Sequence, residues 1–209
     1  MGTDSGMTTV TLLTAAPHED SFNAALAQAW RKGAEASGAT VRHFDVTTLQ
    51  FDPVLRGAYR EPMRDEPDLA AVRAAFEVSS HVTWVFPTWW AGLPAAMKAL
   101  VDRLFLPGWA FRFEGKALPV GLMAGKSTRY VTSMDSPGLW YRLAHHDALA
   151  GSFGRATLGF VGFAPVKRSL VFGTRKLGEA ARGKWLARLE REGGADALEA
   201  KLRRSGVTS

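Results

Sequence analysis

Five short segments rich in β-branched and other apolar residues recur along the chain, and segments with helical spacing of apolar residues separate them. Short apolar runs of this kind are typical of strands that are buried on both faces of a sheet. Strands that alternate with helices predict a parallel sheet with helices on both of its faces. We therefore expect an α/β fold whose five strands cover 8–14, 40–46, 81–86, 128–134 and 166–170.

Helix boundaries are marked most clearly after the first strand. Ser21 is a preferred N-cap residue, apolar residues follow it at helical spacing, and the pattern ends at Gly38. A proline at the first turn opens a later helix, which Pro107 and Gly108 end. The expected helices cover 22–38, 68–78, 94–105, 143–161 and 177–192.

The segment 143–161 is the least clear of these helices. The end of this segment is apolar enough to form either a strand or a helix. We interpret the whole segment as helix, because Pro165 interrupts the chain after it and the alternating pattern from Val166 predicts a better fifth strand.

Length and composition fit one globular domain. The chain has 209 residues, of which 46% are hydrophobic and 22% are charged. We expect this domain to cover 8–194, with fraying ends over 1–7 and 195–209. No apolar run has the length of a membrane span, and the N-terminus lacks a signal-peptide pattern, so the expected location is the cytoplasm.

Residue types exclude several kinds of chemistry. The chain has no cysteine, which excludes disulfides, thiolate catalysis and cysteine-bound metals. Its five histidines show no recognisable metal-binding spacing. We therefore expect no metal site.

The formal charge of +6 is placed unevenly, because residues 167–209 hold eleven Lys and Arg against five Asp and Glu. A basic segment can attract nucleic acid, anionic lipid or an anionic cofactor. Here the basic residues are interleaved with Leu and Trp at helical spacing, which favours a solvated helix face. We expect no nucleic-acid partner and no membrane insertion.

Three loops are expected to meet at one edge of the sheet. In open parallel sheets, ligands bind beyond the carboxyl ends of the strands, near the point where the strand order reverses. The loops 15–21, 87–93 and 133–138 each follow one of the expected strands. Each loop alone is a weak signal, and their shared location predicts one binding site.

The first of these loops suits a phosphate group. It ends at a helix N-terminus, where free N–H groups and the helix dipole favour an anion, and Ser21 and Asn23 add polar side chains. The alternative is that Ser21 is only an N-cap. The loop lacks the glycine-rich pattern of dinucleotide-binding folds, which favours a flavodoxin-like arrangement instead.

The other two loops suit a flat ligand. Trp89 and Trp90 stand next to each other between two prolines, and they offer aromatic surface and backbone N–H groups. The alternative is that both tryptophans pack beneath neighbouring loops. The loop 133–137 offers hydroxyl and main-chain groups, or it is only a turn that ends at Pro137.

The same segments resemble a known family. The chain looks like the flavodoxin-like NAD(P)H-dependent oxidoreductases, the quinone reductase family that includes DT-diaphorase, the modulator of drug activity protein and the ancillary subunits of potassium efflux systems. The similarity covers roughly 8–192. It rests on 21–26, on 86–95 with Lys98, Asp102 and Arg103, on 132–137 with Trp140 and Tyr141, and on 158–163.

This resemblance implies a bound flavin, FMN or FAD, and NAD(P)H as the reductant. The phosphate would lie at Ser21, Phe22 and Asn23, the ring against Pro87, Thr88, Trp89, Trp90 and Ala91, and its far edge at Thr132, Ser133, Met134, Asp135, Ser136 and Pro137. We favour FMN. Family members often have a histidine just before the loop proline, where this chain has Ala16, and His18 is the candidate replacement.

The resemblance also implies residues for chemistry. The family's best-known members place a tyrosine and a histidine near the substrate, and Tyr141 with His145 or His146 lies at a similar distance beyond the third loop. Tyr141 is a candidate donor to a quinone oxygen, and its alternative role is packing with a satisfied hydroxyl.

The function implied is a flavin-dependent transfer of hydride from NAD(P)H to a small aromatic acceptor of the quinone, azo or nitro type, in ping-pong order. The alternatives are a regulatory flavoprotein subunit of a membrane transporter and a flavodoxin-type electron carrier. The aromatic run Trp109, Phe111 and Phe113 is more than one small domain easily buries, so we expect a homodimer whose partner closes the site.

Overall fold

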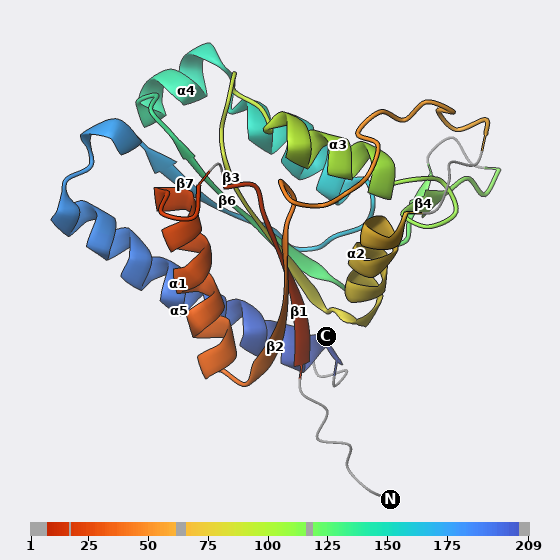
Figure 1. The fold of residues 1–209 in the computed structure, drawn as a ribbon, viewed down its shortest axis with the longest axis horizontal. Coiled ribbons are helices and arrows are strands. Elements are labelled where there is room, and N and C mark those ends of the chain that lie inside the picture. The colour runs from red at the N-terminus through yellow and green to blue at the C-terminus, as the bar shows by residue number, and fades with distance from the viewer. Residues whose placement is uncertain (1–7, 17, 62–65, 116–118, 205–209) are drawn as a thin grey trace, which may run out of the picture.

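A five-stranded parallel sheet forms the centre of the computed structural model, which describes residues 8–16, 18–61, 66–115 and 119–204. The strand order is β2-β1-β3-β6-β7 (Figure 1), and all neighbouring strands are parallel, as the α/β interpretation predicts. The five strands are β1 Thr8–Thr14, β2 Ala39–Asp45, β3 His81–Pro87, β6 Ser127–Met134 and β7 Val166–Phe172. The order reverses between β1 and β3, which places the expected ligand edge there.

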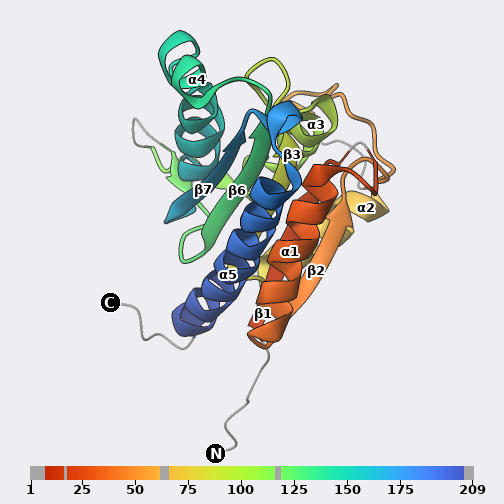
Figure 2. The same cartoon turned by 90° about the vertical axis from the view of Figure 1, so that its left-hand side faces the viewer.

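Helices cover both faces of the sheet. The long helices α1, Phe22–Ala36, and α5, Glu179–Arg204, lie side by side on one face (Figure 2). The other face is covered by α2, Pro67–Val78, by α3, Ala95–Leu104, and by a π-helix, η1, Ala150–Gly159. Each face has its own apolar cluster, because successive strand residues point to opposite sides.

Two glycines let α1 and α5 approach closely. A Cβ atom on Gly193 would lie 2.0 Å from the carbonyl oxygen of Trp30, and one on Gly33 would lie 1.8 Å from the carbonyl oxygen of Glu190. Neither distance leaves room for a side chain. Trp30, between these contacts, is fully buried. The helix pair is therefore fixed by backbone-to-backbone packing.

The prediction that 195–209 frays is wrong for the part that the structure describes. Helix α5 continues to Arg204, and it buries Asp196, Ala197 and Ala200 against the sheet. The domain therefore extends beyond residue 194. Residues 1–7 and 205–209, the rest of the predicted frayed ends, lie outside the described residues.

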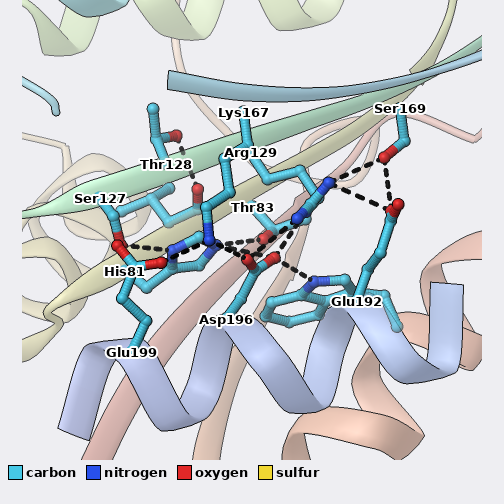
Figure 3. Close-up of polar contacts among 12 residues, drawn as sticks. His81, Thr83, Ser127, Thr128, Arg129, Lys167, Ser169, Glu192, Asp196 and Glu199 are labelled. Atoms are coloured by element: carbon cyan, nitrogen blue, oxygen red, sulfur yellow. Dashed lines mark hydrogen bonds and ion pairs between the residues drawn. The ribbon is translucent and has the colours of Figure 1, made fainter. Parts of the chain in front are cut away.

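A buried polar cluster holds this end of α5 on the sheet (Figure 3). The Asp196 carboxylate accepts hydrogen bonds from Nε of Arg129 at 2.6 Å and from the Trp30 indole at 3.1 Å. Nζ of Lys167 lies 3.0 Å from the same carboxylate, and Nε2 of His81 lies 3.5 Å from it. Because this cluster is at the amino ends of the strands, it lies away from the expected ligand edge.

The single helix predicted over 143–161 is also wrong. Helix α4, Gly138–Ala144, begins earlier and ends at His145, and η1 begins only at Ala150. His146 and Asp147, between them, have φ angles of 49° and 52°. These left-handed residues break the helix, because αR geometry cannot continue through them.

Two residues of the aromatic run Trp109, Phe111 and Phe113 pack within the domain itself. Trp109 packs against the rings of Phe76 and Phe105, and Phe111 is buried in a short antiparallel pair formed by β4, Phe111–Arg112, and β5, Val120–Gly121. Phe113 alone of the three is strongly exposed. The premise that this run is more than one small domain easily buries therefore does not hold for Phe111, which is buried, or for Trp109, which packs half-buried against the core.

Candidate functional site

The carboxyl ends of β1, β3 and β6 are tied together where the three predicted loops begin. The N–H of Ala15 donates to the carbonyl oxygen of Val85 at 2.9 Å, and the N–H of Thr88 donates to that of Ser133 at 2.8 Å. The hydroxyl groups of Thr88 and Thr132 lie 2.6 Å apart. The sheet register thus places the loop 87–93, which carries Trp89 and Trp90 and is called the Trp loop below, directly beside the third loop, 133–138.

The Trp loop is a tight turn in an unusual backbone conformation. The backbones of Trp89 and Gly92 exchange hydrogen bonds of 3.2 and 2.9 Å. Trp90 and Ala91, between them, have φ angles of 51° and 58°. Two consecutive left-handed residues that are not glycine store strain, and strain of this kind is concentrated at binding and active sites.

This turn presents its tryptophans to solvent. The Trp90 side chain is fully exposed, and Trp89 is 50% exposed, so neither packs beneath a neighbouring loop. The N–H groups of Thr88 and Trp89 already donate to backbone carbonyls. Within the described residues, the N–H groups of Trp90 and Ala91 have no acceptor, so they are the two that remain for a ligand.

A pocket of about 420 Å³ lies between the Trp loop and the third loop. Its volume is within the usual range of small-molecule sites. The residues that line it come from both loops and from α4: Thr88, Trp90, Ala91, Met134, Asp135, Ser136, Tyr141 and His145. The structure therefore brings together two of the three predicted loops and both candidate residues for chemistry.

Tyr141 and His145 occupy different environments in this pocket. Tyr141 is buried, and its hydroxyl oxygen accepts a hydrogen bond of 2.9 Å from the N–H of Leu149. Burial raises the pKa of Tyr141 above its ordinary value, so its hydroxyl stays protonated at neutral pH. His145 is exposed, and its ring centre is 6.1 Å from that of Tyr141. Tyr141 is therefore packed with its hydroxyl oxygen hydrogen-bonded, as the packing alternative describes. Its O–H hydrogen is still available to donate to a ligand.

The first loop leads into α1 as the sequence predicts. Ser21 is the N-cap, and its hydroxyl oxygen accepts from the N–H of Ala24 at 3.2 Å. The N–H groups of Phe22 and Asn23 have no acceptor within the helix, because they belong to its first turn. Asn23 is buried, and its Oδ1 has no partner among the described residues. This helix N-terminus therefore has donors available for an anion.

His18 lies on the other side of this loop from the pocket. It is exposed, and it lines a separate hollow between α1 and β2, together with His43 and Asp45. Pro17, which precedes it, lies outside the described residues. Whether His18 takes the place of the family's usual histidine stays a prediction.

The predicted residues that do not line the pocket support it from below or flank it. Pro87, Thr132 and Ser133 are buried at the ends of β3 and β6, and Trp89 is half-exposed and does not line the pocket. Pro137 is the N-cap residue of α4. Ser21 is the N-cap of α1, and Phe22 and Asn23 are in its first turn, after the adjacent loop on the sheet edge.

Sequence analysis missed a fourth loop at this edge, the one between β7 and α5. Thr174 and the N–H of Arg175 both donate to Asp135, at 2.8 and 2.9 Å. The guanidinium group of Arg182 lies 4.8 Å from the ring centre of Phe22 and donates to the carbonyl oxygen of Thr174 at 3.2 Å. A cation is thus held beside the N-terminus of α1. The carboxyl-end rule, applied to the fifth strand as well, identifies this loop.

No metal-binding arrangement of three or more His, Asp or Glu occurs within the described ranges. Among these residues, no helix is both long and apolar enough to span a bilayer.

The sheet order, the helices on both faces and the ligand edge define a flavodoxin-like protein. Residues 8–192 match the model of the family described as "Flavodoxin-like fold". The chain belongs to this family, which confirms the resemblance seen in the sequence.

Two similar proteins are named as NAD(P)H-dependent redox enzymes. Over 125 residues the chain is 26% identical to an uncharacterised NAD(P)H oxidoreductase of Haemophilus influenzae, and the match covers 56% of this chain and 58% of that protein. Over 185 residues it is 22% identical to NAD(P)H dehydrogenase [quinone] 1 of Cavia porcellus, covering 78% of this chain and 67% of the relative. The chain thus spans under two thirds of the length of the Haemophilus relative.

Solved structures agree on the fold. An NAD(P)H:quinone oxidoreductase from Methanothermobacter marburgensis superposes with a TM-score of 0.78 at 18% identity, covering 90% of this chain and 98% of the other. At these identities the likeness shows the fold alone.

Proposed function

We propose that this protein is a flavin-dependent oxidoreductase that passes hydride from NAD(P)H to a small aromatic acceptor of the quinone, azo or nitro type. The observation that carries the proposal is the strained Trp90-Ala91 turn, which borders a 420 Å³ pocket at the carboxyl ends of β3 and β6, next to the point where the strand order reverses between β1 and β3. The redox names of two relatives that match over much of the chain support the same class of reaction.

The residues present fit a flavin ring. The pocket has room for a tricyclic ring, and Trp90 offers an aromatic wall beside it. The free N–H groups of Trp90 and Ala91 would donate to ring heteroatoms. Donors aimed at developing negative charge would stabilise the reduced ring.

The phosphate fits at the N-terminus of α1. The free N–H groups of Phe22 and Asn23 and the hydroxyl of Ser21 are available there, and Arg182, which is held by two backbone carbonyls, adds positive charge nearby. The loop 15–21 has no glycine-rich sequence, so the phosphate would be bound by the helix N-terminus. We favour FMN, and an FMN-dependent NADH-azoreductase of Bacillus anthracis, solved with FMN, shares the fold at a TM-score of 0.68, 14% identity and coverage of 92% of this chain and 99% of that one.

A bound flavin supplies the hydride chemistry, so the chain needs to bind, orient and exclude water. Tyr141 holds a proton on its hydroxyl at neutral pH and would donate a hydrogen bond to an acceptor oxygen. His145, at the mouth of the same pocket, would contact the substrate from the solvent side. One open face for both substrates implies ping-pong kinetics; intersecting double-reciprocal lines would contradict it.

A homodimer is part of the proposal, on a different basis from the aromatic run. Three large apolar side chains of α4, Leu139, Trp140 and Leu143, are 61 to 71% exposed beside the pocket, and Trp90 is exposed across from them. An apolar rim of this kind favours cover by a second copy. Light scattering after size exclusion at micromolar concentration checks this, and a monomeric mass would count against it.

The visible spectrum of the purified protein tests the proposed function. Absorbance bands of a bound flavin are expected, and chromatography of the released cofactor distinguishes FMN from FAD. Bleaching of these bands by NADH or NADPH alone separates a reductase from an electron carrier, which needs a partner to reduce it. Failure to bind either added flavin would overturn the proposal.

A further inference from the structure

Helix α4, which carries Tyr141 and leads into His145, has little packing of its own. Leu139, Trp140 and Leu143 are mostly exposed, and Tyr141 is its only buried side chain. A helix of seven residues is too short to be stable by itself. Its position over the pocket therefore depends on a few anchors elsewhere in the chain.

One face of the edge strand β7 supplies two of these anchors. The Phe172 ring lies 5.9 Å from the Tyr141 ring and directly beneath Gly138, where an added Cβ would be 3.1 Å from it. Arg168 lies four residues earlier on the same face and forms an ion pair with Asp147. The first anchor fixes the start of α4, and the second acts just beyond its end.

The second anchor acts on a strained turn. His146 and Asp147 have left-handed backbone conformations, which are unfavourable for residues other than glycine and need support from outside the turn. The N–H of Asp147 donates to the carbonyl oxygen of Tyr141 at 3.4 Å, and the Asp147 carboxylate binds the Arg168 guanidinium group. His145 immediately precedes this turn, so its direction is set by the turn's geometry.

The ion pair is too exposed to matter greatly for global stability. The side chains of Arg168 and Asp147 are 42% and 23% exposed, and ion pairs this accessible to water contribute little to folding stability. Arg168 does not line the pocket. We therefore expect Arg168 to affect the position of the turn 146–147 and not the stability of the whole domain.

We propose that Arg168 is a positioning residue for the acceptor side of the pocket: by holding Asp147 it fixes the left-handed turn after α4 and so sets the place of His145. This inference rests on the proposed function for its kinetic consequences, and it assigns a role to a residue that does not line the pocket.

Arg168→Gln, which removes the charge and keeps similar length, tests the proposal. With saturating NADH, the KM for a quinone such as menadione is expected to rise about fourfold, while the affinity for flavin stays within about twofold of wild type. Arg168→Lys, which keeps the charge, is expected to recover most of the loss. Arg112→Gln breaks an ion pair of similar exposure with Glu114, on the two-stranded sheet, and is the matched control.

A double-mutant cycle with His145→Ala separates positioning from general weakening. If Arg168 acts through His145, the double variant will be little worse than His145→Ala alone. Additive effects, wild-type kinetics in Arg168→Gln, or failure of Arg168→Lys to restore the KM would overturn the proposal.

Amide hydrogen exchange tests the same idea without any enzyme assay. Exchange over 138–147 is expected to be about fourfold faster in Arg168→Gln than in wild type or in Arg112→Gln, because local opening reports the stability of the anchored segment. Unchanged exchange would refute the positioning role even in a protein that binds flavin normally. A wild-type protein without flavin binding would instead refute the proposed function, and the exchange result would still decide this inference.

Discussion

The Asp196 carboxylate lies 2.6 Å from Nε of Arg129, and both side chains are buried between α5 and the sheet. The two residues are 67 positions apart in sequence, so this contact joins the last helix to a central strand. Lys167 and Trp30 bind the same carboxylate (Figure 3). Buried charges of this kind are costly to leave without partners.

Asp196→Asn is therefore expected to lower the free energy of unfolding by about 3 to 5 kcal/mol, because Arg129 and Lys167 lose their shared counter-charge. Urea denaturation followed by circular dichroism measures the change. Glu190→Gln, at an exposed pair with Lys32, is the control and is expected to change stability by less than about 1 kcal/mol. Equal effects of the two substitutions would show that the buried cluster has no special role.

Stability is expected to fall when the pH is lowered from about 6.5 toward 4. Burial lowers the pKa of His81 from 6.5 to about 4. Within this window the unfolded chain binds a proton that the folded chain does not, so acid favours unfolding, by up to about 3 kcal/mol in total. Burial acts to raise the pKa of Asp196, but the positive charges beside it lower that pKa to about 2, so its contribution is lost only below about pH 4.

Urea midpoints measured between pH 7.5 and 4.5 check this dependence. His81→Gln is expected to flatten the profile above pH 4.5, whatever its stability at neutral pH, because the titrating group is gone. A wild-type profile that is flat between pH 7 and 5 would contradict the assignment to His81.

Gly193→Ala is expected to destabilise the protein by about 3 kcal/mol, because the new methyl group would meet the backbone carbonyl of Trp30 and force α1 and α5 apart. Gly183→Ala, in the same helix with open space around its Cβ, is the matched control. It is expected to stabilise the protein by about 0.5 to 1 kcal/mol through helix propensity. Thermal unfolding of the two variants measures these changes. If helix propensity alone mattered, both variants would be more stable than wild type.

Trp90→Gly is expected to leave stability within about 1 kcal/mol of wild type, because the side chain is exposed and glycine accepts a positive φ. Flavin affinity is expected to fall about tenfold with the loss of the aromatic wall. Ala91→Gly relieves the same kind of backbone strain without removing a ring, so its flavin affinity is expected to stay near wild type. Fluorescence titration with FMN measures both, and similar losses in the two variants would assign the effect to the backbone.

Local patterns were sufficient for the sheet and its ligand edge. The strands predicted from 8–14 and 81–86 match β1 and β3 to within one residue, because buried parallel strands are marked by their own apolar composition. The parallel order then places the loops after β1, β3 and β6 at one edge, whatever their detailed conformation. The Trp loop was identifiable for the same reason.

The end of the last helix, residues 195–204 of α5, could not be predicted from local sequence patterns. Asp196 and its charged neighbours resemble a solvated helix face in the sequence, but Asp196 is buried, because Arg129 and Lys167, on two strands, bring opposite charge to it. The break at His146 and Asp147 likewise depends on Arg168 from β7. Composition and periodicity thus determined which segments form strands and where a ligand edge must lie, since these follow from local burial and strand direction. Only the tertiary structure decided how far α5 extends, how α4 stands over the pocket and which N–H groups remain free, because each depends on partners distant in the sequence.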